Sequence, residues 1–196
     1  MEFKIINRER VFDGFYKMDR FRVQHELFKG GTSPEIVREV MIRPDAVCVL
    51  LFDPRRNQLV FIEQFRIAGS FHGDPWLFEL VAGLIDTQET PEQVARREAI
   101  EEAGLELGRI EKICEYLPSP GGSNEKVFLY IAEVDSSAAG GVHGLEEEGE
   151  DIKVHVLTVE DALAALTSGK INNAAGIMAL QWLQLHRTRL QQLWSE

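Results

Sequence analysis

Residues 83–105 read GLIDTQETPEQVARREAIEEAGL, and this stretch is the most informative part of the chain for both fold and chemistry. It holds two glycines and four glutamates at fixed spacing: Gly83, Gly104, Glu89, Glu98, Glu101 and Glu102. Mg²⁺ prefers oxygen ligands and takes few carboxylates, because it keeps several waters for substrate phosphates. The stretch therefore indicates a site for a divalent cation.

The middle of this stretch has the signature of a helix. Thr90 can cap its start, Pro91 suits its first position, and Gln93 completes a capping box. Residues 94–103 are rich in Ala, Arg and Glu, which favour helices. Gly104 suits the left-handed position just past a helix end. We therefore expect a helix of about three to four turns.

Glu98 and Glu102 are four residues apart and would share one face of that helix, with Glu101 beside them. Like charges at this spacing slightly destabilise a bare helix, and a divalent cation removes that conflict. Arg97 can orient one of the carboxylates through a charge-assisted hydrogen bond. A bare Glu-x-x-x-Glu pattern is usually an ordinary solvated helix face. The matching register of the two glycines, Glu89 and Arg97 favours the metal site here.

The spacing of these residues resembles the Nudix box, the motif of Mg²⁺-dependent enzymes that cleave nucleoside diphosphates linked to another group. Every fixed polar and glycine position is matched, which gives the box these supporting residues: Gly83, Glu89, Arg97, Glu101 and Gly104. The resemblance implies an α/β/α sandwich with a mixed sheet. Gly83 would let a loop precede the helix closely, so that the backbone carbonyl of Ala82 faces the metal.

Composition limits the class of protein. The chain has 196 residues, of which 44% are hydrophobic, enough for one well-packed domain with a small appendage. The formal net charge of −11 argues against a nucleic-acid partner but not against a small anionic substrate, because metals and a few arginines can reverse the local field. Cys48 and Cys114 form neither a disulfide framework nor a metal-ligand spacing.

The sequence gives no reason to expect a membrane partner. No apolar run approaches the roughly 18 residues that span a bilayer. The N-terminal residues carry no signal-peptide pattern. We therefore expect a cytoplasmic protein.

Two regions differ in character along the chain. Residues 1–44 mix charged and apolar residues closely, which predicts an antiparallel sheet with one wet face, and Pro44-Asp45 marks a boundary. Residues 45–196 read as strands, helix, strands, helices, which favours an α+β domain with a mixed sheet. Strands are expected at 46–52, 59–64, 76–81, 111–117, 126–134 and 151–158, and helices at 159–168 and 174–194.

Two further segments are unusually polar. Residues 119–125 read SPGGSNE, a turn-rich loop that by itself is most often a hairpin connection. Residues 143–151 read HGLEEEGED, and five acids in so short a stretch are most often a solvated loop. A mobile acidic loop is also what a catalytic base needs if it closes over a metal-bound substrate.

The order of the box, the Pro-Gly-Gly loop and the acidic loop resembles the ADP-ribose pyrophosphatase branch of the Nudix hydrolases, above all its enteric bacterial members. The similarity runs from about Asp13 to the C-terminal helix, and Pro120 resembles the proline that marks this branch. The resemblance implies the following metal ligands: the Ala82 carbonyl, Glu98, Glu102 and Glu150. It implies Glu148 as the general base, although Glu146 and Glu147 stand in the same row and can also reach the water.

Substrate contacts follow from the same resemblance. Phe15 and Tyr16 would flank the adenine, Arg66 would contact the phosphates, and Glu125 would help to bind the terminal ribose. Further residues would line the site, several of them from the second subunit of a homodimer: Arg38, Glu39, Arg43, Leu84, Ser119, Pro120 and Gly121. Phe15 and Tyr16 can equally be plain sheet residues.

The predicted activity is hydrolysis of ADP-ribose to AMP and ribose 5-phosphate with Mg²⁺, for which Mn²⁺ is a possible substitute. One alternative is a pyrophosphatase for another nucleoside diphosphate sugar, such as a GDP-sugar, because the box does not discriminate between them. A second is a non-catalytic nucleotide-binding sensor on the same fold, against which the intact carboxylate set argues. A third is a structural interaction module, for which the sequence shows neither an exposed apolar stripe nor a linker.

Overall fold

The computed structural model describes residues 1–194, and the chain divides into two compact units. The first unit is Met1–Asp45 together with Leu117–Lys126, and the second is Ala46–Tyr116 together with Val127–Glu196. The first unit is therefore discontinuous in sequence, which a boundary at Pro44-Asp45 alone does not describe.

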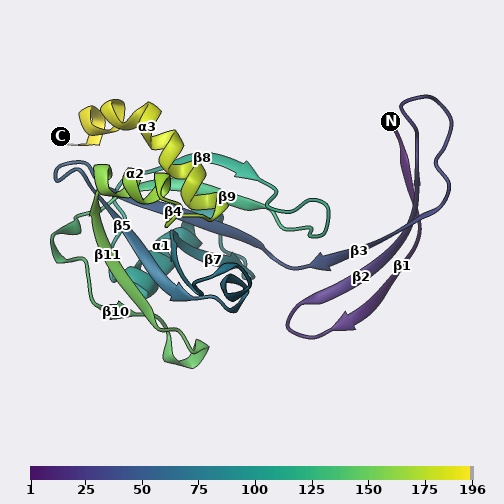
Figure 1. Ribbon diagram of the computed structural model, residues 1–196, viewed down its shortest axis with the longest axis horizontal. Helices are drawn as coiled ribbons and strands as arrows, with labels where there is room; N and C mark the ends of the chain where they lie inside the picture. Colours follow the sequence, from purple (N-terminus) through teal and green to yellow (C-terminus); the bar gives the residue numbers. More distant parts are fainter. Residues whose placement is uncertain (195–196) are drawn as a thin grey trace. The chain divides into compact units, whose positions relative to one another are not determined.

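The first unit is built on three antiparallel strands in the order β1 (Phe3–Asp13), β2 (Lys17–His25) and β3 (Ile36–Ile42), as Figure 1 shows. This confirms the antiparallel sheet expected in the N-terminal region. Every residue of β1 is exposed in the single chain, including Phe3 and Phe12. The sheet therefore leaves large apolar side chains at the surface that the sequence pattern did not reveal.

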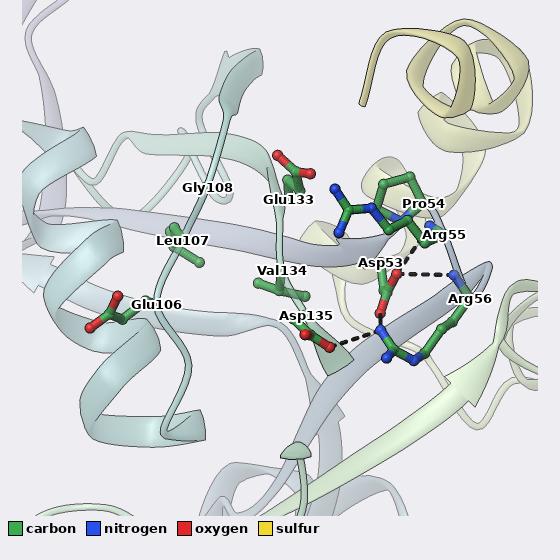
Figure 2. Close-up of a pocket in the computed structure, with 10 residues that line it drawn as sticks. All are labelled: Asp53, Pro54, Arg55, Arg56, Glu106, Leu107, Gly108, Glu133, Val134 and Asp135. Atoms are coloured by element: carbon green, nitrogen blue, oxygen red, sulfur yellow. Dashed lines mark hydrogen bonds and ion pairs between the residues drawn. The ribbon is translucent and has the colours of Figure 1, made fainter. Parts of the chain in front are cut away.

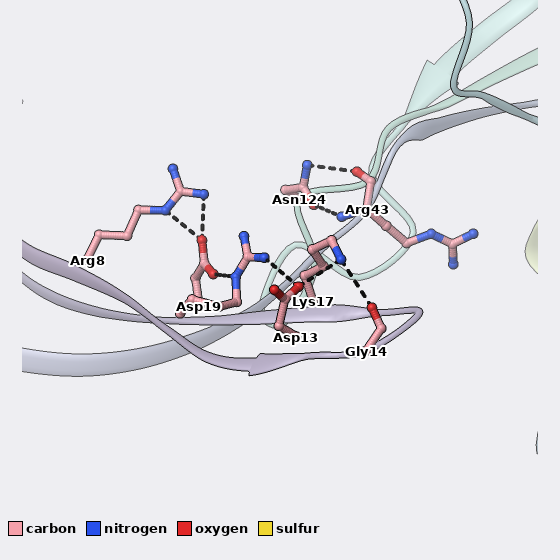
Figure 3. Close-up of polar contacts among 8 residues, drawn as sticks. Arg8, Asp13, Gly14, Lys17, Asp19, Arg43 and Asn124 are labelled. Carbon is pink, nitrogen blue, oxygen red and sulfur yellow. Dashed lines mark hydrogen bonds and ion pairs between the residues drawn. The ribbon is translucent and has the colours of Figure 1, made fainter.

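A buried carboxylate connects β1 and β2. Asp19 is only 2% exposed, and its two oxygens accept hydrogen bonds from Arg8 and Arg10 on the neighbouring strand (Figure 3). These bonds lower the pKa of Asp19, the Arg10 bond acting most strongly. At the turn that follows β1, Lys17 donates to Asp13 at 2.8 Å. Charged groups thus stabilise a sheet that has little apolar core.

Residues 117–126 join the first unit by hydrogen bonds to β3 and the residue after it. The Met41 amide donates to the Gly122 carbonyl at 2.8 Å. The Asn124 side chain accepts from the Arg43 amide at 2.8 Å and donates to the Arg43 carbonyl at 3.1 Å (Figure 3). One side chain therefore makes the pair of bonds that a neighbouring strand would make.

The second unit is built on a mixed sheet in the order β10-β11-β5-β4-β9-β8, with β6 paired to β5 and β7 paired to β4 (Figure 1). The central pair, β4 and β9, is parallel, and β4 and β5 are antiparallel. The strand bounds are as follows: β4 (Asp45–Asp53), β5 (Gln58–Phe65), β6 (Trp76–Glu79), β7 (Val81–Ile85), β8 (Ile110–Tyr116), β9 (Val127–Glu133), β10 (Val142–His143) and β11 (Ile152–Thr158).

Helices cover both faces of this sheet, which confirms the expected α/β/α sandwich with a mixed sheet. Alternate residues of β4 divide between two apolar cores: Val49 packs toward α1 (Pro91–Ala103), and Leu50 packs toward α2 (Val159–Thr167) and α3 (Ala174–Trp194). This alternation follows from the twofold period of a strand. Residues 46–52, a continuous apolar run, are buried on both faces for that reason, apart from the partly exposed Cys48.

The structure differs from the sequence expectation before α1. Residues 76–81 are not one strand, because the chain breaks at Leu80 and β7 pairs with β4 instead of β5. Gly83 lies within β7 and not in a loop, so the residues that face α1 are held by sheet hydrogen bonds. Short 3₁₀ helices also appear that the sequence did not predict: η1 (Ile67–His72), η2 (Ser136–Ala138) and η3 (Glu146–Glu148). Among residues 1–194, no helix is long and apolar enough to cross a membrane.

Candidate active site

Helix α1 carries the acidic motif, and its ends are fixed as expected. The Thr90 side chain accepts from the Gln93 amide at 3.3 Å, and the Gln93 side chain accepts from the Thr90 amide at 2.8 Å. Pro91 is the first helical residue, and Gly104 ends the helix in the left-handed conformation at φ +66°. This capping box and C-terminal glycine confirm the predicted helix and set which residues face the sheet.

Glu102 is the most deeply buried acid of the motif. Its side chain is 2% exposed, and its Oε2 accepts a hydrogen bond from the Ala82 amide of β7 at 2.9 Å. Burial is the largest effect on the Glu102 pKa, which is raised to about 8 despite this bond. The Glu102 carboxylate and the backbone of Ala82 are thus side by side.

Glu98 lies one turn earlier, against Gly83 of the same strand. A β-carbon built on Gly83 would lie 2.1 Å from Oε1 of Glu98, so no side chain fits there. Burial raises the pKa of Glu98 to about 7, and the negative charges of Glu101 and Glu150 add to the shift. The glycine is therefore needed for close approach of helix and strand.

Arg97 is the cation of the motif. Its guanidinium contacts Glu89 at 3.3 Å, Glu98 at 2.9 Å and Glu101 at 2.7 Å. Arg97 therefore binds Glu89, Glu98 and Glu101, whereas Glu102 bonds to the backbone of β7. These ion pairs are the contacts through which Arg97 can orient a carboxylate, as expected from the sequence.

The donor set suits a divalent cation that keeps part of its water shell. After burial, the negative charges of Glu98 and Glu150 further raise the pKa of Glu102, and a divalent cation beside these carboxylates would remove that conflict. Within residues 1–194, no group of three or more His, Cys, Asp or Glu side chains is arranged to hold a metal ion alone.

The acidic loop faces the same helix. Glu150 is partly buried, and its negative charge raises the pKa of both Glu98 and Glu102, so its carboxylate lies near theirs. Its Oε2 accepts from the Leu145 amide at 3.1 Å. Glu148, the last residue of η3, is exposed. The loop thus places one acid beside the buried pair and leaves another free in solvent.

Three residues of strands β5 and β7 and of the turn after β5 complete this region of the second unit. Arg66 is exposed, pairs with Glu79 at 2.8 Å, and its positive charge lowers the pKa of Glu102. Leu84 is half-buried in β7. Gln64 was not predicted: it is buried, its Oε1 has no hydrogen-bond partner, and it shares a strand face with Ile62, which packs under α1. A buried amide is not recognisable from sequence, because Gln is ordinarily an exposed residue.

The remaining predicted residues belong to the first unit, where three of them cluster. The Arg43 guanidinium lies 5.5 Å from the centre of the Tyr16 ring and 3.3 Å from Glu125, and burial raises the pKa of Glu125. The Arg43 Nε is buried without a hydrogen-bond partner. Phe15 is 84% exposed in the turn between β1 and β2 and contacts the Tyr16 ring, so it is no plain core residue.

Other predicted residues of this unit are exposed and separate from that cluster. Arg38 donates to the carbonyl of Val37, and Glu39 pairs with Arg20 across β2 and β3. The loop residues are at the surface: Ser119, Pro120 and Gly121. The role of Asn124 could not be predicted from the sequence, because its two hydrogen bonds to Arg43 join residues 81 positions apart.

A cavity of about 340 Å³ lies elsewhere in the second unit, beside the turn after β4 and the end of β9. Figure 2 shows that three of its charged residues pair with one another: Arg56 contacts Asp53 at 2.9 Å and Asp135 at 2.8 Å. Neither of the buried unpaired atoms found among residues 1–194, on Arg43 and Gln64, lines it. We therefore place the chemistry at α1 and not in this cavity.

Comparison with known proteins identifies the family of the chain. The family model of the NUDIX domain matches residues 42–181, which include α1, β7 and the acidic loop. The chain belongs to the Nudix family. The Nudix match covers β4 to β11, α1, α2 and the first third of α3.

Relatives of this Nudix chain are known by name. It is 48% identical over 193 residues to the ADP-ribose pyrophosphatase of Escherichia coli K12, covering 98% of this chain and 92% of that protein. It is 38% identical over 160 residues to the GDP-mannose pyrophosphatase of Enterobacter sp. strain 638, covering 80% of this chain and 82% of that protein. A crystal structure of an ADP compounds hydrolase superposes with a TM-score of 0.70 at 19% identity, covering 95% and 96% of the two chains, which shows the shared fold.

Proposed function

We propose that the chain hydrolyses the pyrophosphate bond of ADP-ribose with water, releasing AMP and ribose 5-phosphate. The observation that carries the proposal is that the buried Glu102 and the partly buried Glu98 both lie against the backbone of β7. High identity over nearly the whole chain to proteins named ADP-ribose pyrophosphatase supports the choice of substrate.

The cofactor we propose is Mg²⁺, with Mn²⁺ as a possible substitute. The residues that would hold it are Glu98, Glu102, Glu150 and the carbonyl of Ala82. When bound, the ion would polarise the phosphoryl oxygens and stabilise the charge that develops on them. The burial of the carboxylate pair and the nearby charge of Glu150 support this ligand set.

Glu148 would accept the proton of the attacking water. Its exposed position on a loop rooted beside the buried acids supports this role, because such a group can approach substrate without first losing a partner. Arg66 would bind phosphate oxygens through its planar guanidinium. In the free protein Arg66 pairs with Glu79 while staying 44% exposed, so it is available to an anion.

The contacts to adenine and ribose predicted for the first unit stay predictions. Their support is the exposed Phe15 ring and the cluster of Tyr16, Arg43 and Glu125. An aromatic ring in solvent suits a flat base, and the unpaired Arg43 Nε suits an acceptor oxygen.

We also propose a homodimer in the cytoplasm. The support for the dimer is the sheet of the first unit, whose apolar side chains at Phe3 and Phe12 are 74% and 61% exposed in the single chain. A second copy would cover them. Sedimentation equilibrium of the wild type and of Phe12→Asp tests this, with a dimer expected for the first and a weakened dimer for the second.

A GDP-sugar is the second candidate substrate, favoured by the 38% identity to a GDP-mannose pyrophosphatase. That similarity covers less of the chain and is weaker than the similarity to the ADP-ribose enzymes. A non-catalytic nucleotide sensor is disfavoured because the full carboxylate set is present in folded geometry.

The test is nucleoside monophosphate release from a panel of nucleoside diphosphate sugars at equal concentration, with Mg²⁺ and with a chelator. We expect metal-dependent AMP release, fastest from ADP-ribose. Glu98→Gln should abolish it with folding intact, whereas Glu92→Gln, on the exposed face of the same helix, should leave it unchanged. Faster turnover of a GDP-sugar would discard ADP-ribose as substrate, and tight binding without turnover would make the protein a sensor.

A further inference from the structure

We propose that His143 is a positioning residue that fixes the acidic loop against the end of α1. The inference rests on the proposed function, because it concerns how Glu148 and Glu150 are presented to the residues of that helix. His143 lies in β10, the short strand that leads into the loop, and is partly buried. No motif of the sequence singles it out.

The first contact joins the histidine ring to Gly104, the residue that ends α1. A β-carbon built on Gly104 would lie 2.6 Å from Cε1 and 3.2 Å from Nδ1 of His143. The ring therefore rests directly on the glycine backbone. A glycine is needed at position 104 for two reasons: its φ of +66° is unfavourable for other residues, and a β-carbon there would clash with the imidazole.

Two hydrogen bonds fix the same place. Nε2 of His143 lies 2.8 Å from the carbonyl of Gly140, and because a carbonyl only accepts, Nε2 carries the proton and donates. The amide of Gly144 donates to the carbonyl of Glu101 in the last turn of α1 at 3.1 Å. The residues around β10 are thus hydrogen-bonded both to the segment just before this strand and to α1, the helix that carries the acidic motif.

The loop beyond this point is closed on itself. The Glu150 amide donates to the Leu145 carbonyl at 3.2 Å, and the Leu145 amide donates to the Glu150 carboxylate at 3.1 Å. The segment from 145 to 150 therefore moves as one piece about its root. Since the root is held by His143, the ring sets where Glu148 and Glu150 stand relative to α1.

Supporting residues of this kind typically change metal affinity or activity by about 10-fold to 100-fold when they are removed. His143→Ala removes both the ring on Gly104 and the donor to Gly140. We expect kcat for ADP-ribose to fall at least about 10-fold with KM within about threefold, because the loop acts on the reacting atoms and not on substrate capture. His143→Gln, which keeps an amide donor at similar reach, should restore most of kcat.

Hydrogen exchange supplies a readout that does not depend on activity. In the metal-free protein, His143→Ala should speed exchange of the Gly144 amide by about 10-fold or more, because its bond to the Glu101 carbonyl joins the root of the loop to α1 and opens when the root is released. Val142→Ala is the matched control: its side chain is 65% exposed, and it precedes His143 in the same strand. It should alter neither exchange nor kcat.

A double substitution separates the contact from general damage. Gly104→Ala should lower kcat in the wild-type background, where the new methyl group meets the ring. In the His143→Ala background it should lower kcat little further, because the loop is already released. Additive losses would contradict the proposed contact.

The outcomes distinguish the two proposals. Absence of hydrolysis of any nucleotide sugar by the wild type would defeat the proposed function, while the exchange experiment would still decide whether His143 holds the loop. The inference is overturned if His143→Ala leaves the Gly144 amide as protected as in the wild type. It is also overturned if kcat stays within about twofold of wild type while exchange rises, since the loop would then be free without consequence.

Discussion

The α-carbon of Gly83 and the carboxylate of Glu98 lie so close that a β-carbon on Gly83 would be 2.1 Å from Oε1, 2.4 Å from Cδ and 2.5 Å from Cγ of the glutamate. Three atoms of one side chain occupy the place of a methyl group. The Glu98 side chain therefore occupies space that only a glycine leaves open in β7, and this placement partly buries Glu98.

Gly83→Ala should separate the helix from the strand or force Glu98 out of its place. We expect kcat/KM for ADP-ribose to fall by roughly 100-fold or more, a loss of about 3 kcal/mol in transition-state stabilisation. Steady-state kinetics measures this. Gly122→Ala is a suitable control, because nothing lies within 4 Å of its built β-carbon and its backbone bonds are kept. Near-normal activity of Gly83→Ala would contradict the close-packing argument.

Asp53 should make the free energy of unfolding depend on pH at the acid end. Burial alone would raise its pKa, but hydrogen bonds from Ser136 and Arg56 outweigh burial and lower the pKa to about 2. A lowered pKa stabilises the fold above the unfolded-state value of about 4, and that contribution is lost as pH falls from about 4 to about 2. Its size at neutral pH is about 2 kcal/mol.

Urea unfolding of Asp53→Asn measures this contribution. At pH 7 the variant should be less stable than the wild type by about 2 kcal/mol, and the two should converge as pH approaches about 2. Asp86→Asn, at an exposed position, should match the wild type throughout. A difference that persists unchanged at pH 2 would show that Asp53 acts through packing and not through its charge.

Gln64 should lower the stability of the fold while supporting activity. Its buried Oε1 lacks a partner, and an unsatisfied buried acceptor costs about 1 to 3 kcal/mol. Gln64→Met, of similar length and without a polar atom to satisfy, should raise the free energy of unfolding by about 1 kcal/mol. It should also lower kcat/KM, because the amide shares the face of β5 that packs under α1. A stability below that of the wild type would contradict the first part.

Asn124→Ala should loosen the segment 117–126 from β3. The loss of two hydrogen bonds to the Arg43 backbone, at 2.8 and 3.1 Å, should lower the free energy of unfolding of this unit by about 1 to 2 kcal/mol. Faster hydrogen exchange of the Arg43 amide is the direct measurement. Asn172→Ala, at an exposed position, is the matched control and should have no effect.

Elements with local signals were predictable from sequence. The capping box at Thr90 and the left-handed Gly104 indicated both ends of α1, because each cap involves residues within five positions of each other. The apolar run of β4 and the helical spacing of α3 were recognisable for the same reason: their periods follow from strand and helix geometry.

Contacts between distant segments were not predictable. Gly83 lies in a strand and not in a loop, because its neighbours hydrogen-bond to β4, and one sequence does not reveal which strands pair. The contact between His143 and Gly104 and the bonds of Asn124 to Arg43 join residues 39 and 81 positions apart. The individual roles in binding and proton transfer likewise follow from resemblance to the family.

The side-chain hydrogen bonds of Asn124 have a consequence for where the protein can be truncated. Because 117–126 belongs with the N-terminal strands, the polypeptide passes between the two units three times: after Asp45, after Tyr116 and after Lys126. A gene fragment that starts at residue 46 would carry a ten-residue segment stripped of its hydrogen-bonding partner. Neither unit can be separated from the other by a single cut in the chain, so truncations and fusions of this protein must keep both units.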